Sequence, residues 1–245
     1  MVEVLKSFVG ESRIWIYGFG IEGQSSFRFF KSHGFDVGVI DGNSELIVED
    51  SSCIILGQDV SAFFSSCDSL DLIIRSAGIS PLKPEIQQAL KCGARISSQL
   101  NIFALLCPLP VVAVTGTMGK GTTCSVLKHI CDASGVRTQI GGNFGLAMLD
   151  LIAQLDDLDF VILELSSFQL MDFAGRSEGR GGFDISIFLR TTSEHLDWHV
   201  DQEEYLWAKT QLTSRQSSEQ FLIVNADSAH AVSMAQDSLA KVISF

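Results

Sequence analysis

The chain has 245 residues, a formal net charge of −12 at pH 7 and a pI near 4.7. This acidity argues against a nucleic-acid or anionic-membrane surface, because both need clustered Lys and Arg side chains. A hydrophobic content of 46% with regularly spaced glycines is typical of packed α/β proteins and excludes a disordered chain.

Cysteine usage and the absence of targeting segments predict a cytoplasmic location. The six cysteines form no C-x-x-C pair, and most lie in apolar segments, as in a reducing environment. Residues 1–12 carry charges and lack the apolar core of a signal peptide, and no apolar run is long enough to span a bilayer. We expect a cytoplasmic, monomeric protein without nucleic-acid or membrane partners.

The first part of the chain alternates predicted strands (13–17, 36–40, 71–75, 95–97) with predicted helices (24–33, 84–92, 99–106). Gly18-Phe19-Gly20-Ile21-Glu22-Gly23 follows the first strand, and Asp41 stands about twenty residues further on. This is the G-x-G-x-x-G fingerprint of dinucleotide-binding folds. Three interpretations stay open: an NAD or FAD site, a Rossmann-like unit binding another nucleotide, and a close turn without a ligand.

A domain boundary is predicted at Cys107-Pro108-Leu109-Pro110, because two prolines interrupt regular structure immediately before a new strand. The predicted domains are therefore 1–108, a Rossmann-like unit, and 109–245, a second α/β unit.

The second unit opens with a β-branched strand at 111–115, a glycine-rich turn with Lys120, and a helix from about 122 to 133. Such a turn presents backbone N–H groups, a helix N-terminus and one cation to a phosphate. The match to G-x-x-x-x-G-K-[ST] is imperfect, since Val114 replaces the first glycine and Gly121 replaces the hydroxyl residue. A tight turn without a ligand is the alternative.

Polar residues follow the later predicted strands (137–140, 160–165, 184–189, 220–224, 241–245). Glu164 lies in an apolar strand, where a carboxylate is costly unless it is ion-paired or bound to a metal, and both explanations stay open. His195 and His199 follow the strand 184–189 and could bind metal, orient a substrate or do neither. Lys209 lies inside a helix predicted at 201–214.

Taken in this order, these segments resemble the Mur ligases of peptidoglycan synthesis over nearly the whole chain. Residues 115–120 are similar to the family's shortened phosphate loop, which lacks the outer glycine, and residues 141–145 resemble its substrate-side turn. The most specific segment is 163–170, which is similar to the members that add D-glutamate. Residues 194–197 together with Ala208-Lys209 resemble a motif that contains a Mg²⁺-binding histidine and a carbamylated lysine.

The resemblance implies ATP-dependent amide synthesis. The carboxylate of UDP-N-acetylmuramoyl-L-alanine attacks the γ-phosphate, and the amine of D-glutamate displaces phosphate from the resulting acyl phosphate. The implied catalytic residues are Lys120, Asn143, His195 and Lys209. The implied ATP contacts are Gly116, Thr117, Met118, Gly119, Lys120, Gly121 and Thr122. The implied Mg²⁺ ligands are Glu164, His195, Thr122 and carbamylated Lys209. The UDP-substrate contacts are Gly20, Ile21, Glu22, Asp41, Asn43, Gly78, Asn143 and Ser166, so the fingerprint would hold UDP and not NAD.

Three departures from the family pattern bear on activity. Gly121 removes a hydroxyl, so that Thr122 would serve Mg²⁺ from one position later, and Arg190 stands where Asn is usual. The chain also ends inside the predicted central domain, before the family's adenine-contacting segments and third domain. We therefore expect a fragment that binds the UDP substrate, and ATP weakly, without completing the ligation. The alternatives are an inactive binding module derived from the ligase and an NAD(P)-binding Rossmann protein.

Overall fold

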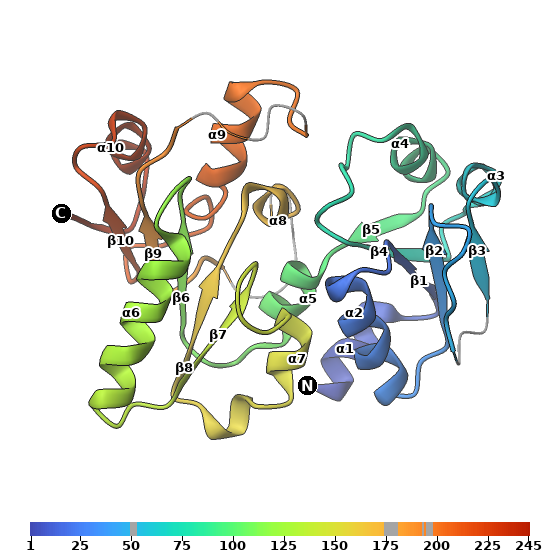
Figure 1. The fold of residues 1–245 in the computed structure, drawn as a ribbon, viewed down its shortest axis with the longest axis horizontal. Coiled ribbons are helices and arrows are strands. Elements are labelled where there is room, and N and C mark those ends of the chain that lie inside the picture. The colour runs from blue at the N-terminus through green and yellow to red at the C-terminus, as the bar shows by residue number, and fades with distance from the viewer. Residues whose placement is uncertain (50–52, 174–180, 193, 195–197) are drawn as a thin grey trace. The chain divides into compact units, whose positions relative to one another are not determined.

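A computed structural model describes residues 1–49, 53–173, 181–192, 194 and 198–245. The chain divides into two compact units, Met1–Leu106 and Cys107–Phe245, which run from blue to green and from green to red in Figure 1. Each unit is built on its own parallel sheet, which confirms the predicted α/β class. Among the described residues, no helix is long and apolar enough to cross a membrane.

The first unit has a five-stranded sheet in the order β3-β2-β1-β4-β5. Its strands are β1 (Arg13–Tyr17), β2 (Val37–Asp41), β3 (Ile54–Leu56), β4 (Asp71–Arg75) and β5 (Arg95–Ser97). Its helices are α1 (Val2–Val9), α2 (Ile21–Ser32), α3 (Asp59–Ser66), α4 (Pro84–Lys91) and α5 (Gln99–Leu106). Helix α2 begins at Ile21, inside the glycine fingerprint and earlier than predicted, and α1, β3 and α3 were not predicted.

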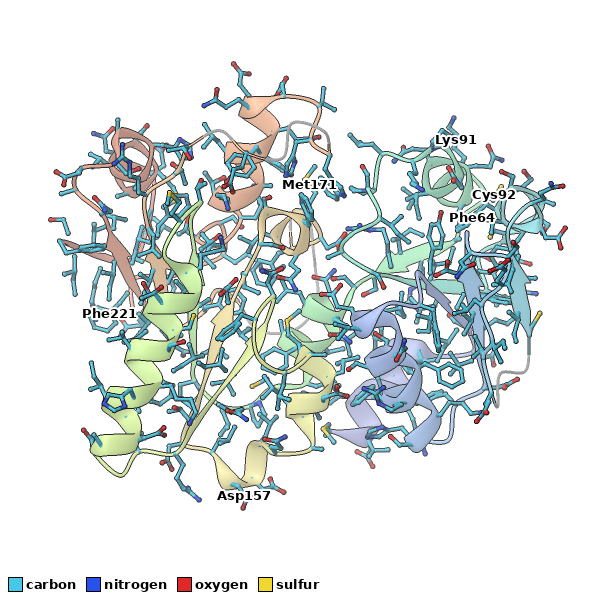
Figure 2. The ribbon with its side chains drawn as sticks, viewed as in Figure 1. Phe64, Lys91, Cys92, Asp157, Met171 and Phe221 are labelled. Atoms are coloured by element: carbon cyan, nitrogen blue, oxygen red, sulfur yellow. The ribbon has the colours of Figure 1, made fainter. Side chains whose placement is uncertain are left out.

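Successive strand residues point to opposite sides of the first sheet, and other elements pack on both faces. On one face Tyr17 packs in a cluster with Phe64 of α3, which is fully buried, and with the partly buried Cys92 after α4; the last two are labelled in Figure 2. On the other face Ile16 lies against Gly23 of α2, where a Cβ would stand 3.3 Å from Ile16 Cγ2. The sheet is therefore a rigid layer that fixes the loops at its carboxyl edge.

The second unit has a six-stranded sheet in the order β11-β10-β9-β6-β8-β7. Its strands are β6 (Val111–Thr115), β7 (Thr138–Gly142), β8 (Phe160–Glu164), β9 (Ile185–Phe188), β10 (Phe221–Val224) and β11 (Lys241–Ser244). Its helices are α6 (Lys120–Ala133), α7 (Met148–Ile152), α8 (Ser167–Met171), α9 (Gln202–Thr210) and α10 (Ala229–Gln236), with a 3₁₀ turn at Leu155–Asp157. Met171 and Phe221, labelled in Figure 2, mark the end of α8 and the start of β10.

Strand order places a candidate site in each unit. In the first sheet, β2 and β3 lie on one side of β1, and β4 and β5 lie on the other. In the second sheet, β7 and β8 lie on one side of β6, and β9, β10 and β11 lie on the other, so the strand order reverses at β1 and at β6. Parallel α/β sheets bind ligands in the crevice outside the carboxyl ends of strands at such a reversal. The glycine fingerprint follows β1 and the lysine turn follows β6, so both predicted loops lie at these positions.

Candidate functional site

A pocket of about 600 Å³ lies at the carboxyl ends of β1, β2 and β4 in the first unit. Five residues predicted to contact the UDP substrate line it: Gly20, Ile21, Glu22, Asp41 and Gly78. Asn43 is not among the lining residues, and its backbone N–H donates to Asp41 Oδ1 at 2.8 Å. The fingerprint loop therefore faces a cavity large enough for part of a nucleotide.

Two glycines of the fingerprint are required by backbone geometry. Gly18 has a φ of 88°, and a Cβ on Gly23 would stand 2.0 Å from the Gly18 carbonyl oxygen. Glu22, in the first turn of α2, accepts a hydrogen bond from the backbone N–H of Ala77 at 2.9 Å and so joins the start of α2 to the loop after β4. These glycines allow α2 to start close to the end of β1.

Asp41 holds the glycine turn in place. Its Oδ2 accepts from the backbone N–H of Phe19 at 2.7 Å, and its Oδ1 accepts from Asn43 at 2.8 Å. In dinucleotide-binding folds the acidic residue at this place binds a ribose hydroxyl. Here each carboxylate oxygen accepts one backbone hydrogen bond, so Asp41 also stabilises the turn itself.

The lysine turn of the second unit folds around two glycines of positive φ. Gly116 has a φ of 148° and Gly119, the N-cap of α6, a φ of 87°. Lys120 Nζ donates to the carbonyl oxygens of Gly116 at 3.1 Å and Thr117 at 2.9 Å, so the ammonium lies over the turn. Met118, within the same turn, is 71% exposed.

Glu164, at the end of β8, is 5% exposed and accepts from Asn143 Nδ2 through Oε1 at 2.9 Å. Its other oxygen faces the start of α6, since a Cβ on Gly121 would stand 3.1 Å from Oε2. Thr122 is exposed at the next position of the helix. The role of Thr122 as a metal ligand stays a prediction, whereas Gly121 is the residue that directly faces the Glu164 carboxylate.

Lys209 of α9 is 2% exposed, and its Nζ donates to the Gly116 carbonyl oxygen at 2.9 Å. The ammonium also lies 4.7 Å from the ring centroid of Tyr205. Burial, together with the nearby charge of Lys120, lowers the pKa of Lys209 to about 7, while Glu194 acts in the opposite direction. A substantial fraction of this side chain is therefore an uncharged, nucleophilic amine at neutral pH.

Tyr205 is a site residue that the sequence interpretation missed. Its hydroxyl lies 2.8 Å from Thr117 Oγ1, and the Thr117 hydroxyl lies 3.0 Å from the Thr192 carbonyl oxygen. Residues four apart share one face of a helix, so Tyr205 could have been recognised as the neighbour of Lys209. Together these contacts link the lysine turn, the loop after β9 and α9.

Side chains from the lysine turn, from the loop after β7, from the start of α8 and from α9 surround a cavity of about 180 Å³. Its lining includes Lys120, Asn143, Ser166, Ser167, Tyr205 and Lys209, so three of the predicted catalytic residues meet there. Ser166 also caps α8 by accepting from the backbone N–H of Gln169 at 3.2 Å. His195, the fourth predicted catalytic residue, lies outside the described residues. Arg190 is exposed, and its carbonyl oxygen accepts from Thr117 N at 2.9 Å.

Of the residues predicted to bind Mg²⁺, the structure describes Glu164, Thr122 and Lys209. Within the described part of the chain, no group of three or more His, Cys, Asp or Glu side chains could hold a metal ion. The set predicted for Mg²⁺ contains His195, which is not described. Glu164 nevertheless offers a buried carboxylate oxygen beside the lysine turn, and oxygen ligands suit Mg²⁺.

Comparison with known proteins identifies relatives for both units. Residues 114–245 match the family described as Mur ligase middle domain, and residues 12–98 match the Mur ligase MurD-like N-terminal domain. A UDP-N-acetylmuramoylalanine–D-glutamate ligase of Clostridium botulinum is 30% identical over 248 residues, which cover 98% of this chain and 52% of the relative. The enzyme of the same name from Ruminiclostridium cellulolyticum is 31% identical, covering 92% of this chain and 48% of the relative.

Solved structures show the same fold. The UDP-N-acetylmuramate:L-alanyl-gamma-D-glutamyl-meso-diaminopimelate ligase of Neisseria meningitides aligns with a TM-score of 0.59 at 16% identity, covering 96% of this chain and 78% of that chain. A murein peptide ligase of Psychrobacter arcticus aligns with a TM-score of 0.54 at 16% identity, covering 94% of this chain and 52% of that chain. The chain spans about half the length of the curated relatives it matches. By its two domain matches, this chain belongs to the Mur ligase family.

Proposed function

We propose that this chain supplies the UDP-substrate site and the ATP site of a ligase that joins D-glutamate to UDP-N-acetylmuramoyl-L-alanine in peptidoglycan precursor synthesis. Support comes from relatives of that name at 30% identity. The observation that carries the proposal is the meeting of Lys120, Asn143 and Lys209 around one cavity at the carboxyl edge of the second sheet, with Glu164 hydrogen-bonded to Asn143.

Phosphoryl transfer depends on positioning and charge neutralisation more than on covalent help from the protein. Lys120 and the N–H groups of the turn 116–121 are proposed to bind the β- and γ-phosphates of ATP. Asn143, already hydrogen-bonded to Glu164, is proposed to align the carboxylate of the UDP substrate. ATP in this position would present its γ-phosphate to the cavity that Ser166 also lines.

Among the described residues, the Glu164 carboxylate suits a magnesium ion. Glu164 has one oxygen bonded to Asn143 and the other directed at the start of α6, beside the lysine turn. We assign Glu164 as a Mg²⁺ ligand, with His195 and Thr122 as further candidates. Bound there, the ion would neutralise phosphate charge.

Lys209 fits the proposed carbamylation. Carbamate formation requires an uncharged amine, and the pKa of Lys209 is lowered to about 7. The uncharged amine adds to CO₂ and releases one proton, so the product is a carbamate anion. An ammonium would repel a metal bound nearby, whereas a carbamate would attract it.

The test is calorimetric titration of the chain with UDP-N-acetylmuramoyl-L-alanine, followed by Mg-ATP and by NADH. Micromolar binding of the UDP compound that is lost in Glu22→Ala would support the assignment of the first pocket. The exposed Glu3→Ala variant on α1 is the matched control, and its affinity is expected to equal that of the parent chain.

Binding of NADH without binding of the UDP compound would refute the ligase assignment. It would instead favour a dinucleotide-binding protein with a structural second unit.

A further inference from the structure

A buried serine, a buried histidine and a partly exposed carboxylate connect the cavity of the second unit to the first turn of α9. Ser167 Oγ lies 2.9 Å from His199 Nε2, and His199 Nδ1 lies 3.3 Å from Glu204 Oε2. Ser167 is 1% exposed and lines the cavity, and the His199 side chain is fully buried. We call these three residues the serine–histidine relay.

The direction of the two hydrogen bonds in the relay follows from the Glu204 carboxylate. Glu204 Oε2 also accepts from the backbone N–H of Val200 at 2.9 Å, and the Glu204 N–H donates to Asp201 Oδ1 at 2.8 Å, which holds it in the first turn of α9. A carboxylate accepts hydrogen bonds, so the proton of a neutral imidazole belongs on Nδ1. Nε2 then accepts, and the Ser167 hydroxyl must donate to it.

The same contacts join α8 to α9. The Phe168 and Trp198 rings, each adjacent in sequence to a relay residue, stack with centroids 4.2 Å apart, and His199 meets the Tyr205 ring edge-on at 5.4 Å. Helix α8 begins at Ser167, and α9 carries Tyr205 and Lys209. The relay therefore connects two walls of one cavity through a directional pair of hydrogen bonds.

We propose that His199 is a positioning residue for the nucleotide site, a role that rests on the proposed function. By accepting the hydrogen bond that the Ser167 hydroxyl donates, His199 fixes the start of α8 against α9 and turns the lone pairs of the Ser167 oxygen toward the cavity. Ser167 is then an acceptor for a donor group or cation of the bound ligand. Packing alone would hold the helices together without setting this polarity.

The first measurement is the tautomer of His199, read by ¹⁵N NMR of the histidine rings and assigned by the signal lost in His199→Gln. The inference requires the neutral ring with its proton on Nδ1. A proton on Nε2, or a doubly protonated ring, would overturn it, because Ser167 would then be the acceptor of the ring proton.

The second measurement is Mg-ADP affinity in a matched pair of variants. In His199→Gln the amide reaches the position of Nε2 and keeps a bond to Ser167, whereas in His199→Asn it reaches the position of Nδ1 and keeps Glu204 instead. Both variants lose the ring packing, so the thermal stability of both should fall. We expect Mg-ADP binding to weaken at least about tenfold in His199→Asn and to stay within about threefold of the parent chain in His199→Gln.

The outcomes separate this inference from the proposed function. His129→Asn, on the exposed side of α6, is the control and should bind as the parent chain does. Equal affinities in the two His199 variants would reduce His199 to a packing residue and overturn the inference, while loss of binding in Lys120→Ala would still support the nucleotide site. No Mg-ADP binding by the parent chain would overturn both.

Discussion

Replacing Gly121 with serine adds a hydroxyl at the point where the start of α6 faces Glu164. The Cβ would stand 3.1 Å from Glu164 Oε2, a tight contact that a small movement of the carboxylate relieves. No positive φ is recorded at Gly121, so a side chain is compatible with the backbone. The added hydroxyl is then within reach of a buried carboxylate oxygen.

The contribution of the hydroxyl to the free energy of unfolding is measured against Gly121→Ala, which adds the same Cβ without the hydroxyl. A hydrogen bond to a charged group contributes about 1.5–3 kcal/mol, and serine is about 0.5 kcal/mol poorer than alanine in helices. The serine variant should therefore exceed the alanine variant by about 1–2.5 kcal/mol in free energy of unfolding. At roughly 2–4 °C per kcal/mol, this raises Tm by several degrees.

The assay is urea unfolding of the parent chain and both variants, followed by circular dichroism. A serine variant no more stable than the alanine variant would refute the geometry, since Glu164 would not then be directed at residue 121. Mg-ADP titration adds a functional reading. If Glu164 binds the metal beside this position, serine should bind Mg-ADP more tightly than alanine does, and the difference should vanish in EDTA.

Three further predictions follow from the site geometry. Lys209→Met should raise the free energy of unfolding at pH 7 by about 1–4 kcal/mol, because it removes a buried amine that the unfolded chain protonates more readily. Since its folded pKa is about 7 against an ordinary 10.5, the stability of the parent chain should rise from pH 7 toward pH 10 in urea titrations, and this rise should be absent in the variant. Gly23→Ala should destabilise the first unit by about 1–3 kcal/mol, because its Cβ would meet the Gly18 carbonyl oxygen at 2.0 Å; an unchanged urea midpoint would contradict this. Asp41→Ala leaves two backbone N–H groups without their acceptor and should weaken UDP-N-acetylmuramoyl-L-alanine binding in calorimetry, with equal affinity counting against its role in the turn.

Strand positions were predictable because buried parallel strands are short apolar runs bounded by turns. The predicted strands 13–17 and 71–75 coincide with β1 and β4. Helix starts were less predictable: α2 and α6 begin inside their glycine turns, at Ile21 and Lys120, because the turn itself supplies the first helical residues. Short elements such as β3 and α3 have little periodicity and went unrecognised.

Site residues were predictable where a motif placed them at a strand end. Lys120, Asn143 and Lys209 are far apart in sequence and meet at one cavity. The partner of Glu164 was not predictable, because the contact with Asn143 depends on the pairing of β7 with β8, where Gly142 lies beside Glu164. The contact between Ser167 and His199 likewise depends on how α8 packs on α9.

The most direct test of the central claim is Mg-ATP titration of the parent chain and of Lys120→Ala, with the exposed Lys91→Ala as control. Lys120 Nζ lies over the turn that is proposed to bind phosphates, so its loss should weaken Mg-ATP binding by about tenfold to a hundredfold. The control should bind as the parent chain does. Equal affinity in Lys120→Ala and the parent chain would contradict the assignment of this turn as the phosphate site.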